Sequence, residues 1–278
     1  MAESQGVKQT IKRSVPAPIW GLAREAYLGL RRLPRSWEAS HHPWRRDSIA
    51  RLAEWKDKYK GQRAIIIGNG PSLNQTDLAR LKNEFTFGLN RIFLMFPKLG
   101  FNTSCLVSVN DLVIEQSIDD ITALSIPKFL SWHSHRYFNP SSAIPSLPIF
   151  LYTTYESPRF SRDASSRLWE GATVTNVALQ LAYHMGFQQV ILIGVDHNFT
   201  SKGEANKTVV SEGDDPNHFS PGYFGKGFRW QLPDLDTSEV GYQMARQAYE
   251  KAGREVLDAT VGGKLTVFRK VDYNSLFR

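Results

Sequence analysis

Residues 63 to 73 read RAIIIGNGPSL, a short apolar run that leads directly into a glycine-rich turn. The run is typical of a buried strand, and the glycines allow a sharp turn whose backbone can approach a ligand closely. The segment lacks both the Gly-Lys-Ser/Thr ending of a Walker A loop and the third glycine of the dinucleotide fingerprint. A plain strand-to-helix turn is the alternative interpretation. Because open α/β sheets bind ligands beyond the carboxyl ends of their strands, we predict a phosphate or ribose site at Gly68, Asn69, Gly70 and Ser72.

Downstream of this turn, short apolar runs alternate with helical stretches. Candidate strands are residues 64–67, 86–89, 105–109, 128–130, 149–152, 190–193 and 256–259. Thr173 to Met185 is the clearest helix, since its apolar residues share one face and Gly186 follows as a stop. Such alternation is typical of βα units around a parallel sheet. The sequence therefore predicts one Rossmann-like α/β domain over residues 61 to 278, with a mainly parallel sheet.

Polar side chains and a glycine stand at the ends of several predicted strands and at the start of the predicted helix from residue 173. These positions are Asn90, Asn110, Asp111, Thr173, Asn176, Gly194, Asp196 and Asn198. The carboxyl ends of parallel strands share one edge of a sheet, so we expect these residues to converge on one crevice. Each residue alone is more often a cap or a turn. We predict that together they bind a nucleotide, with Thr173 and Asn176 on its phosphate.

Residues 197 to 236 form a long polar insertion rich in glycine and aromatic residues. An insertion of this length without regular structure is usually a functional lid or a disordered segment. Within it, DDPNHFSPGYF at 214–224 places His218 among aromatic residues, where a histidine can act as a general base near neutral pH. A non-catalytic His218 is the alternative, because the chain has seven histidines. The Asp-x-Asp sequence at 234–236 has the form of a metal site, but the following helix favours Asp236 as an N-cap, and we predict no metal site.

The positive charge of the chain is concentrated at its N-terminus. Residues 1 to 60 hold 13 of the 34 basic and 6 of the 27 acidic residues, which leaves 21 of each in residues 61 to 278. The net charge of +7 therefore belongs to a helical N-terminal arm, and we predict no nucleic-acid partner. Residues 16–33 form a basic amphipathic helix that Pro34 ends, and residues 46–60 form a second helix. Docking on an anionic membrane surface and packing on the domain are the two roles open to the first helix.

The composition favours a globular protein, with 41% hydrophobic and 12% aromatic residues in 278. No stretch approaches the roughly 18 consecutive apolar residues of a membrane-spanning helix, and the first residues lack the apolar core of a secretory signal. We expect a cytoplasmic protein whose membrane contact, if any, is peripheral to the inner membrane. The single cysteine, Cys105, lies in an apolar run, which favours a buried and non-catalytic side chain.

Three segments, IIIGNGPSL, FGLNRIF and ILIGVDHNF, together resemble two related families over roughly residues 62 to 200. The family-42 bacterial sialyltransferases have a similar GNGPSL turn, an asparagine that ends the second strand, and a Gly-x-Asp strand. The family named after the archaeal 6-hydroxymethylpterin diphosphokinase, MptE-like or DUF115, has a turn that looks like GxGPSL and a third strand ending in an aspartate. The first resemblance implies a variant nucleotide-sugar transferase fold with a lid over the crevice.

The sialyltransferase resemblance implies a metal-independent, inverting transferase with a CMP-sugar donor and a glycan acceptor, acting in surface polysaccharide synthesis. It implies nucleotide contacts for Asn69 and Asn90. It also implies a histidine base in the lid, for which His218 is the candidate, although spacing from the last strand puts the family positions near Asp236 and Thr237.

One residue departs from the sialyltransferase pattern. That family carries a tyrosine, two residues after the Gly-x-Asp aspartate, that helps the phosphate leave, and this chain has Asn198 there. Tyr223 of the lid is the substitute that the sequence offers, and we predict it as a second catalytic residue.

The diphosphokinase resemblance implies a different chemistry in the same crevice. ATP and Mg²⁺ would bind there, with Asp111 or Asp196 as metal ligands. The turn asparagine and the GLN at residues 88–90 favour the glycosyltransferase prediction. A third alternative is a non-catalytic nucleotide-binding partner in glycan assembly.

Overall fold

The computed structural model describes residues 17–139, 144, 146–201 and 203–277, without the side chains of residues 17–20. Residues 1–16 of the predicted arm lie outside this range. The chain divides into two compact units, the first ending at His42 and the second beginning at Pro43. In the first unit, helix α2 spans Ala17–His41.

The prediction that Pro34 ends this helix is wrong, because α2 runs through it. Proline removes one backbone hydrogen bond and strains the preceding turn. Pro34 is exposed, so water can satisfy the carbonyl that its missing N–H leaves open.

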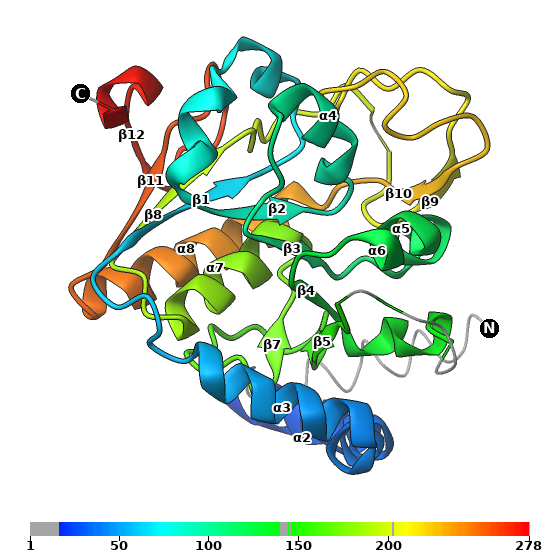
Figure 1. The fold of residues 1–278 in the computed structure, drawn as a ribbon. Coiled ribbons are helices and arrows are strands. Elements are labelled where there is room, and N and C mark those ends of the chain that lie inside the picture. The colour runs from blue at the N-terminus through cyan, green and yellow to red at the C-terminus, as the bar shows by residue number, and fades with distance from the viewer. Residues whose placement is uncertain (1–16, 140–143, 145, 202, 278) are drawn as a thin grey trace. The chain divides into compact units, whose positions relative to one another are not determined.

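A parallel sheet of eight strands forms the centre of the second unit (Figure 1), and all of its strand pairs are parallel. The spatial order is β12-β11-β8-β1-β2-β3-β4-β5. The strands are β1 (Arg63–Ile67), β2 (Phe85–Leu89), β3 (Cys105–Ser108), β4 (Lys128–Ser131), β5 (Ile149–Leu151), β8 (Gln189–Ile193), β11 (Glu255–Asp258) and β12 (Arg269–Lys270). The Rossmann-like α/β class and the seven predicted strands are confirmed, and β12 is an additional edge strand.

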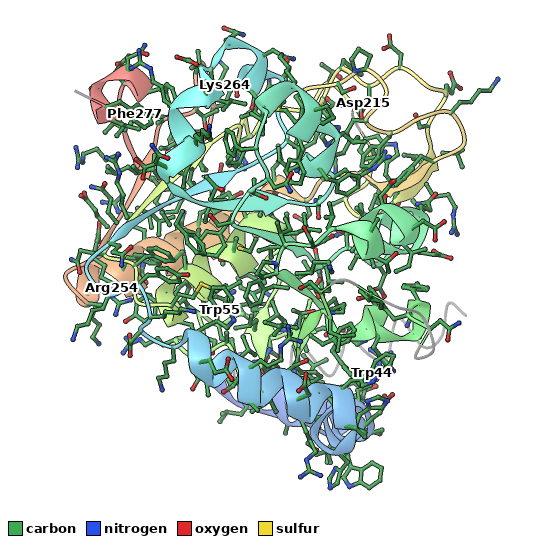
Figure 2. All side chains as sticks on the ribbon, in the orientation of Figure 1. Trp44, Trp55, Asp215, Arg254, Lys264 and Phe277 are labelled. Atoms are coloured by element: carbon green, nitrogen blue, oxygen red, sulfur yellow. The ribbon has the colours of Figure 1, made fainter. Side chains whose placement is uncertain are left out.

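Helices cover both faces of this sheet. The α-helices are α3 (Pro43–Trp55), α4 (Phe96–Leu99), α5 (Asp111–Gln116), α6 (Ile118–Ala123), α7 (Val174–His184) and α8 (Leu235–Lys251). Short 3₁₀ helices are η1 (Pro71–Gln75), η2 (Leu78–Asn83), η3 (Ile92–Met95), η4 (Trp132–Tyr137) and η5 (Tyr273–Phe277). Helices α7 and α8 lie side by side on one face, and η1 to η3 with α4 lie on the other (Figure 1). Figure 2 shows side chains filling the space between these layers.

The core lies mainly between the sheet and α7. All of Ala64 to Ile67 and Val190 to Ile193 are fully buried, as expected for central parallel strands covered on both faces. The turn that follows α3 adds Tyr59, whose ring stacks on Phe187 with centroids 5.0 Å apart. The buried position predicted for Cys105 is confirmed.

The insertion at residues 197–236 contains regular structure that the sequence does not predict. Strands β9 (Thr208–Val210) and β10 (Arg229–Gln231) form an antiparallel hairpin. Outside the insertion, a second small pair joins β6 (Thr153–Thr154) to β7 (Leu168–Trp169). The hairpin docks on α5, because the Arg229 N–H donates to Gln116 Oε1 at 2.8 Å and its guanidinium pairs with Glu115 at 2.9 Å. Figure 1 shows this lid beside α5 and α6.

The order of the strands reverses between β1 and β8. From β1 the chain builds the sheet outward through β2 to β5, and it then returns to place β8 on the other side of β1. The loops that leave β1 and β8 therefore begin side by side and then continue over opposite faces of the sheet. In open α/β sheets a ligand crevice lies at such a switch point.

The closeness of these two loops predicts which glycines tolerate a side chain. A Cβ added to Gly68 would lie 2.2 Å from the backbone oxygen of Gly194, so we expect Gly68→Ala to lower the free energy of unfolding by about 1 to 3 kcal/mol. Gly225→Ala is the control, since an added Cβ there meets nothing within 4 Å. Urea unfolding of both variants tests this, and equal stability of the two would contradict it.

Candidate functional site

The turn after β1 is joined to the end of β8 by backbone and side-chain hydrogen bonds. The N–H of Gly68 donates to the Ile193 carbonyl at 2.8 Å, and that of Gly70 donates to the Gly194 carbonyl at 2.9 Å. The Asp196 carboxylate accepts from the Ser72 N–H at 3.1 Å and from the Ser72 hydroxyl at 2.7 Å. These amides are therefore engaged within the protein. The N–H groups of Gly68, Gly70 and Ser72 are thus not free to bind the phosphate predicted at this turn.

A cleft of about 160 Å³ opens above this junction, at the switch point of the sheet. Helix starts, strand ends and the lid all contribute to its walls. The predicted site residues that line it are Gly68, Asn69, Gly70, Asn90, Thr173, Gly194, Asp196, Asn198 and His218. Residues from five separate parts of the chain thus meet in one place, as the strand-end argument predicts.

Four other predicted site residues do not line this cleft. Asn110 caps α5, with its Oδ1 accepting from the Leu112 N–H at 3.0 Å, and Asp111 pairs with Arg136 at 3.0 Å. Ser72 lies behind Asp196, as described above. Asn176 is buried between the starts of α7 and α8, where its Nδ2 donates to the Trp169 carbonyl at 3.0 Å. The predicted phosphate contact of Asn176 does not fit this position.

Tyr223 is also outside the cleft. Its side chain is fully buried and its hydroxyl accepts from the Arg91 N–H at 3.3 Å, while the Arg91 guanidinium donates to the Tyr223 carbonyl. Burial raises the pKa of the Tyr223 hydroxyl. The prediction that Tyr223 reaches a leaving group does not fit this geometry, because its side chain is buried and its hydroxyl is hydrogen-bonded to the Arg91 N–H.

Two asparagines present amide groups to the cleft. Asn69 is buried, and within the described part of the chain its Oδ1 has no hydrogen-bond donor. Asn90 accepts the Ser108 hydroxyl on its Oδ1 at 3.0 Å, which leaves its NH₂ group as the donor for a ligand. A buried carbonyl oxygen without a partner is costly, so Asn69 Oδ1 is suited to accept from a bound ligand.

His218 faces the cleft from the lid and is held by a buried aspartate. Its Nδ1 lies 2.7 Å from Asp215 Oδ2, and both side chains are largely buried. The ring stacks on Tyr223 with centroids 3.9 Å apart. In the neutral imidazole the carboxylate keeps the proton on Nδ1, which leaves Nε2 as an acceptor. Tyr223 therefore serves as a platform for the ring rather than as a reactive group.

The lid is fixed to the turn directly beside His218. The Phe219 N–H donates to the Asn69 carbonyl at 2.9 Å, and Asn74 Nδ2 donates to the Phe219 carbonyl at 2.8 Å. Asp215, labelled in Figure 2, was not predicted from the sequence as a site residue, although it stands three residues before His218 in the DDPNH segment. The i, i+3 spacing was the available signal.

A second histidine also lines the cleft, at the strand end that carries Asp196 and Asn198. His197 follows β8, and its Nε2 lies 3.0 Å from Glu239 Oε1 on α8. The His197 side chain is 7% exposed, whereas Glu239 is 46% exposed, so the pair reaches from the cleft to solvent. The cleft thus contains two histidines, each with an acidic partner.

Unusual backbone conformations gather around the cleft. Asn90, Ala172 and His197 all line it and have φ values of 47°, 54° and 51°. A side chain in this left-handed region costs about 1 kcal/mol or more, and such residues persist where the surrounding structure holds them. Strain of this kind is typical of ligand sites.

The electrostatics of the cleft come mainly from helix ends. No lysine or arginine belongs to the described residues that line it. The N-termini of α7, capped by Thr173, and of α8, capped by Asp234, both contribute to its wall. The start of α7 carries partial positive charge, which suits a phosphate, whereas the Asp234 carboxylate offsets the partial charge at the start of α8. The N-cap of α8 is Asp234, so the prediction of Asp236 as the cap is wrong.

The carboxylates of the cleft are partnered. Burial raises the pKa of Asp196, with a further upward contribution from nearby Asp258, against the hydrogen bonds from Ser72. Burial also acts upward on Asp234, but hydrogen bonds from Tyr155, Thr237 and Asn206 bring its pKa below the ordinary value.

A magnesium site made by Asp111 and Asp196 does not fit this arrangement. Only Asp196 lines the cleft, its two oxygens accept from Ser72, and Asp111 is paired with Arg136. Within the described residues, no group of three or more His, Cys, Asp or Glu side chains is placed to hold a metal ion.

The fold and the cleft define a Rossmann-like α/β protein with its ligand crevice at the strand-order switch. The chain belongs to the family described as 6-hydroxymethylpterin diphosphokinase MptE-like, whose model matches residues 45–202, more than half of the chain. Comparison with curated protein sequences gives no match.

A solved structure is also similar: the MAf glycosyltransferase from Magnetospirillum magneticum AMB-1, with 16% identity and a TM-score of 0.48. The match covers 82% of this chain and 38% of that chain. This chain therefore spans well under half of the solved protein's length.

A half-buried acid stands just before α7. Burial raises the pKa of Glu170 to about 7, Asp111 and Glu156 add repulsion, and a hydrogen bond with Thr153 acts in the opposite sense. Gly171 and Ala172, which follow it, both have positive φ. The charge state of Glu170 is therefore coupled to the stability of the segment that carries Thr173.

This shift makes the stability of the protein depend on pH. The folded pKa lies above the unfolded value near 4.5, so the contribution is complete below that value and is lost as pH rises through about 7. We expect Glu170→Gln to change the free energy of unfolding, relative to wild type, more favourably at pH 8 than at pH 5. The difference between the two pH values should be at most roughly 3 kcal/mol. Urea unfolding at both pH values measures this, with exposed Glu204→Gln as control. An equal effect of Glu170→Gln at both pH values would refute the coupling.

Proposed function

We propose that the chain is a nucleotide-binding transferase that moves a sugar from a CMP-sugar donor to a hydroxyl acceptor with inversion. The observation that carries the proposal is the Asp215–His218 pair, which faces the same cleft as the unpartnered Asn69 oxygen. A base and a nucleotide-recognition group in one cleft are what group transfer from a nucleotide requires. The resemblance of the three sequence segments to family-42 sialyltransferases suggests cytosine as the base of the nucleotide.

His218 acts as the general base in this proposal. Its Nε2 takes the proton of the acceptor hydroxyl while that oxygen attacks the anomeric carbon of the sugar. The bond from this carbon to the phosphate oxygen breaks, and CMP leaves with the bonding electrons. Asp215 holds the ring in the required tautomer and stabilises the imidazolium that forms.

Asn69 and Asn90 hold the nucleotide. Asn69 Oδ1 accepts a hydrogen bond from an exocyclic amine or a ribose hydroxyl, and the Asn90 NH₂ group donates to the base or sugar. The complementary donor and acceptor would distinguish one base edge from another.

The phosphate lies against the start of α7 and near His197. With no lysine or arginine among the described lining residues, the helix N-terminus supplies partial positive charge as the leaving phosphate develops its own negative charge, and the His197 ring lies in the same cleft. The His197 ring is held from α8, because its Nε2 lies 3.0 Å from Glu239 Oε1. His197 thus takes the place that the sequence prediction gave to Tyr223.

The cleft is smaller than its proposed ligand. Sites for drug-sized molecules usually measure about 300 to 1,000 Å³, and this cleft measures about 160 Å³. Entry of a whole nucleotide-sugar therefore needs a movement of the lid, which the hydrogen bonds of Phe219 and Asn74 hold in its present position.

Nucleotide binding is tested by thermal-shift titration with CMP, CDP, UDP, ATP and GTP, each with Mg²⁺ or with EDTA. We expect CMP to raise the melting temperature in EDTA, and Asn69→Ala to weaken that binding by about tenfold, the effect of one buried hydrogen bond. Exposed Asn102→Ala is the control and should bind like wild type. Stabilisation by ATP only with Mg²⁺ would favour a diphosphokinase, which is the activity in the family's name. No response to any of these nucleotides would mean that the protein does not bind them, and this result would contradict the proposal.

The base assignment makes a separate prediction. His218→Ala should lower turnover by about 10² to 10⁴-fold, as loss of a general base does, while CMP affinity stays within a few-fold of wild type. Asp215→Asn should lower turnover in the same direction, because the ring loses its tautomer control. Turnover is measured as CMP release from a CMP-sugar, with His41→Ala, outside the cleft, as control. Full activity of His218→Ala would remove this residue from the mechanism.

A further inference from the structure

Helix α2 of the first unit carries an apolar face that is open to solvent. Leu22, Tyr27, Leu30, Leu33 and Trp37 are each more than half exposed. At 3.6 residues per turn these five positions fall within an arc of about 140° around the helix axis. Five large exposed apolar side chains on one arc are unusual for a water-facing helix, because scattered single residues are the normal case.

Arginines border this face. Arg24, Arg31 and Arg35 occupy the sector of the helix next to the apolar arc, about 40° wide, and all three are exposed. The Arg31 guanidinium lies 5.8 Å from the ring centroid of Tyr27, so the basic edge and the apolar face are contiguous. Glu38 is the acidic residue closest to this sector. The border therefore has a net positive charge.

We propose that this apolar arc, together with its arginine edge, docks α2 in the plane of an anionic lipid surface. Leucine side chains enter the acyl boundary, tyrosine and tryptophan suit the headgroup level because their rings carry a polar group, and arginines at the edge meet anionic headgroups. This charge complementarity selects lipid over a neutral apolar partner.

The length of the helix fits this orientation. Twenty-five residues span about 37 Å, and no helix in the described part of the chain is long and apolar enough to cross a membrane. Because α2 continues through Pro34 to His41, Trp37 joins the face, which the shorter predicted helix would have lacked. The surface thus extends along the whole described length of α2.

The experiment is co-sedimentation of the full chain with vesicles of phosphatidylcholine alone or with roughly a third phosphatidylglycerol. We expect binding to the anionic vesicles that weakens with added salt and little binding to the neutral ones. Leu30→Glu/Trp37→Glu should weaken binding at least about tenfold. Leu147→Glu is the matched control, since Leu147 is equally exposed but lies in the second unit.

The charge contribution has its own matched pair of variants. Arg31→Gln/Arg35→Gln should weaken binding to anionic vesicles by roughly 30-fold, at the known contribution of each basic residue near a charged surface. Arg159→Gln/Arg162→Gln removes two exposed arginines of the second unit and should change nothing.

Three outcomes would overturn the proposal. One is failure of the wild-type chain to bind anionic vesicles. Another is unchanged binding of Leu30→Glu/Trp37→Glu. The third is evidence that the face packs on protein: either the wild-type chain forms a dimer in gel filtration that this variant abolishes, or the variant lowers the melting temperature. The first result would mean that the face packs on a second copy, and the second that it packs on the domain. An unchanged melting temperature in both double variants confirms that they remain folded.

Discussion

The close approach of the turn after β1 to the end of β8 is the constraint on which the rest of the structure depends. Two backbone hydrogen bonds join these loops, and an added Cβ on Gly70 would lie 1.8 Å from Asp196 Oδ2. Gly194 is equally restricted, since its φ is +65° and Leu73 packs against it. Glycine is required here for the contact between two protein segments. The glycines thus shape the floor of the cleft, and the side chains around it meet the ligand.

The other walls of the cleft are positioned from this floor. Asp196 is held by Ser72, and the lid is anchored where the Phe219 N–H reaches the Asn69 carbonyl. His218 follows from that anchor, because it directly precedes Phe219. The left-handed backbone at Ala172 and His197 aims the starts of α7 and the loop after β8 at the same space. Rigid strand ends thus carry a site whose reactive groups come from loops.

The sheet could be predicted from the sequence because its central strands are buried on both faces and read as continuous apolar runs. β12 could not, since Arg269 and Lys270 carry no apolar signal and pair only with β11. The length of α2 was missed because an exposed proline is tolerated where a buried one is not. The lid hairpin was missed because its strands are short and alternate exposed with half-buried residues.

The position of the cleft followed from strand order, but the direction of single side chains did not. Asn90 and Asn110 both follow strands of the sheet, yet one lines the cleft and the other caps α5. Thr173 and Asn176 both lie at the start of α7, yet only Thr173 faces the cleft, because Asn176 is turned towards α8. Residues one helical turn apart, or after neighbouring strands, can therefore differ in whether they face the cleft. Asp215 and His197 depend on partners that are near only in the folded chain.

A crystal structure of the chain with CMP would show directly whether this cleft binds the nucleotide. We expect CMP in the cleft at the junction of β1 and β8, with a hydrogen bond to Asn69 Oδ1, its phosphate at the start of α7, and His218 Nε2 facing the side where the sugar would be attached. CMP bound at another place, or in this cleft without contact to Asn69 and with His218 turned away, would contradict this expectation.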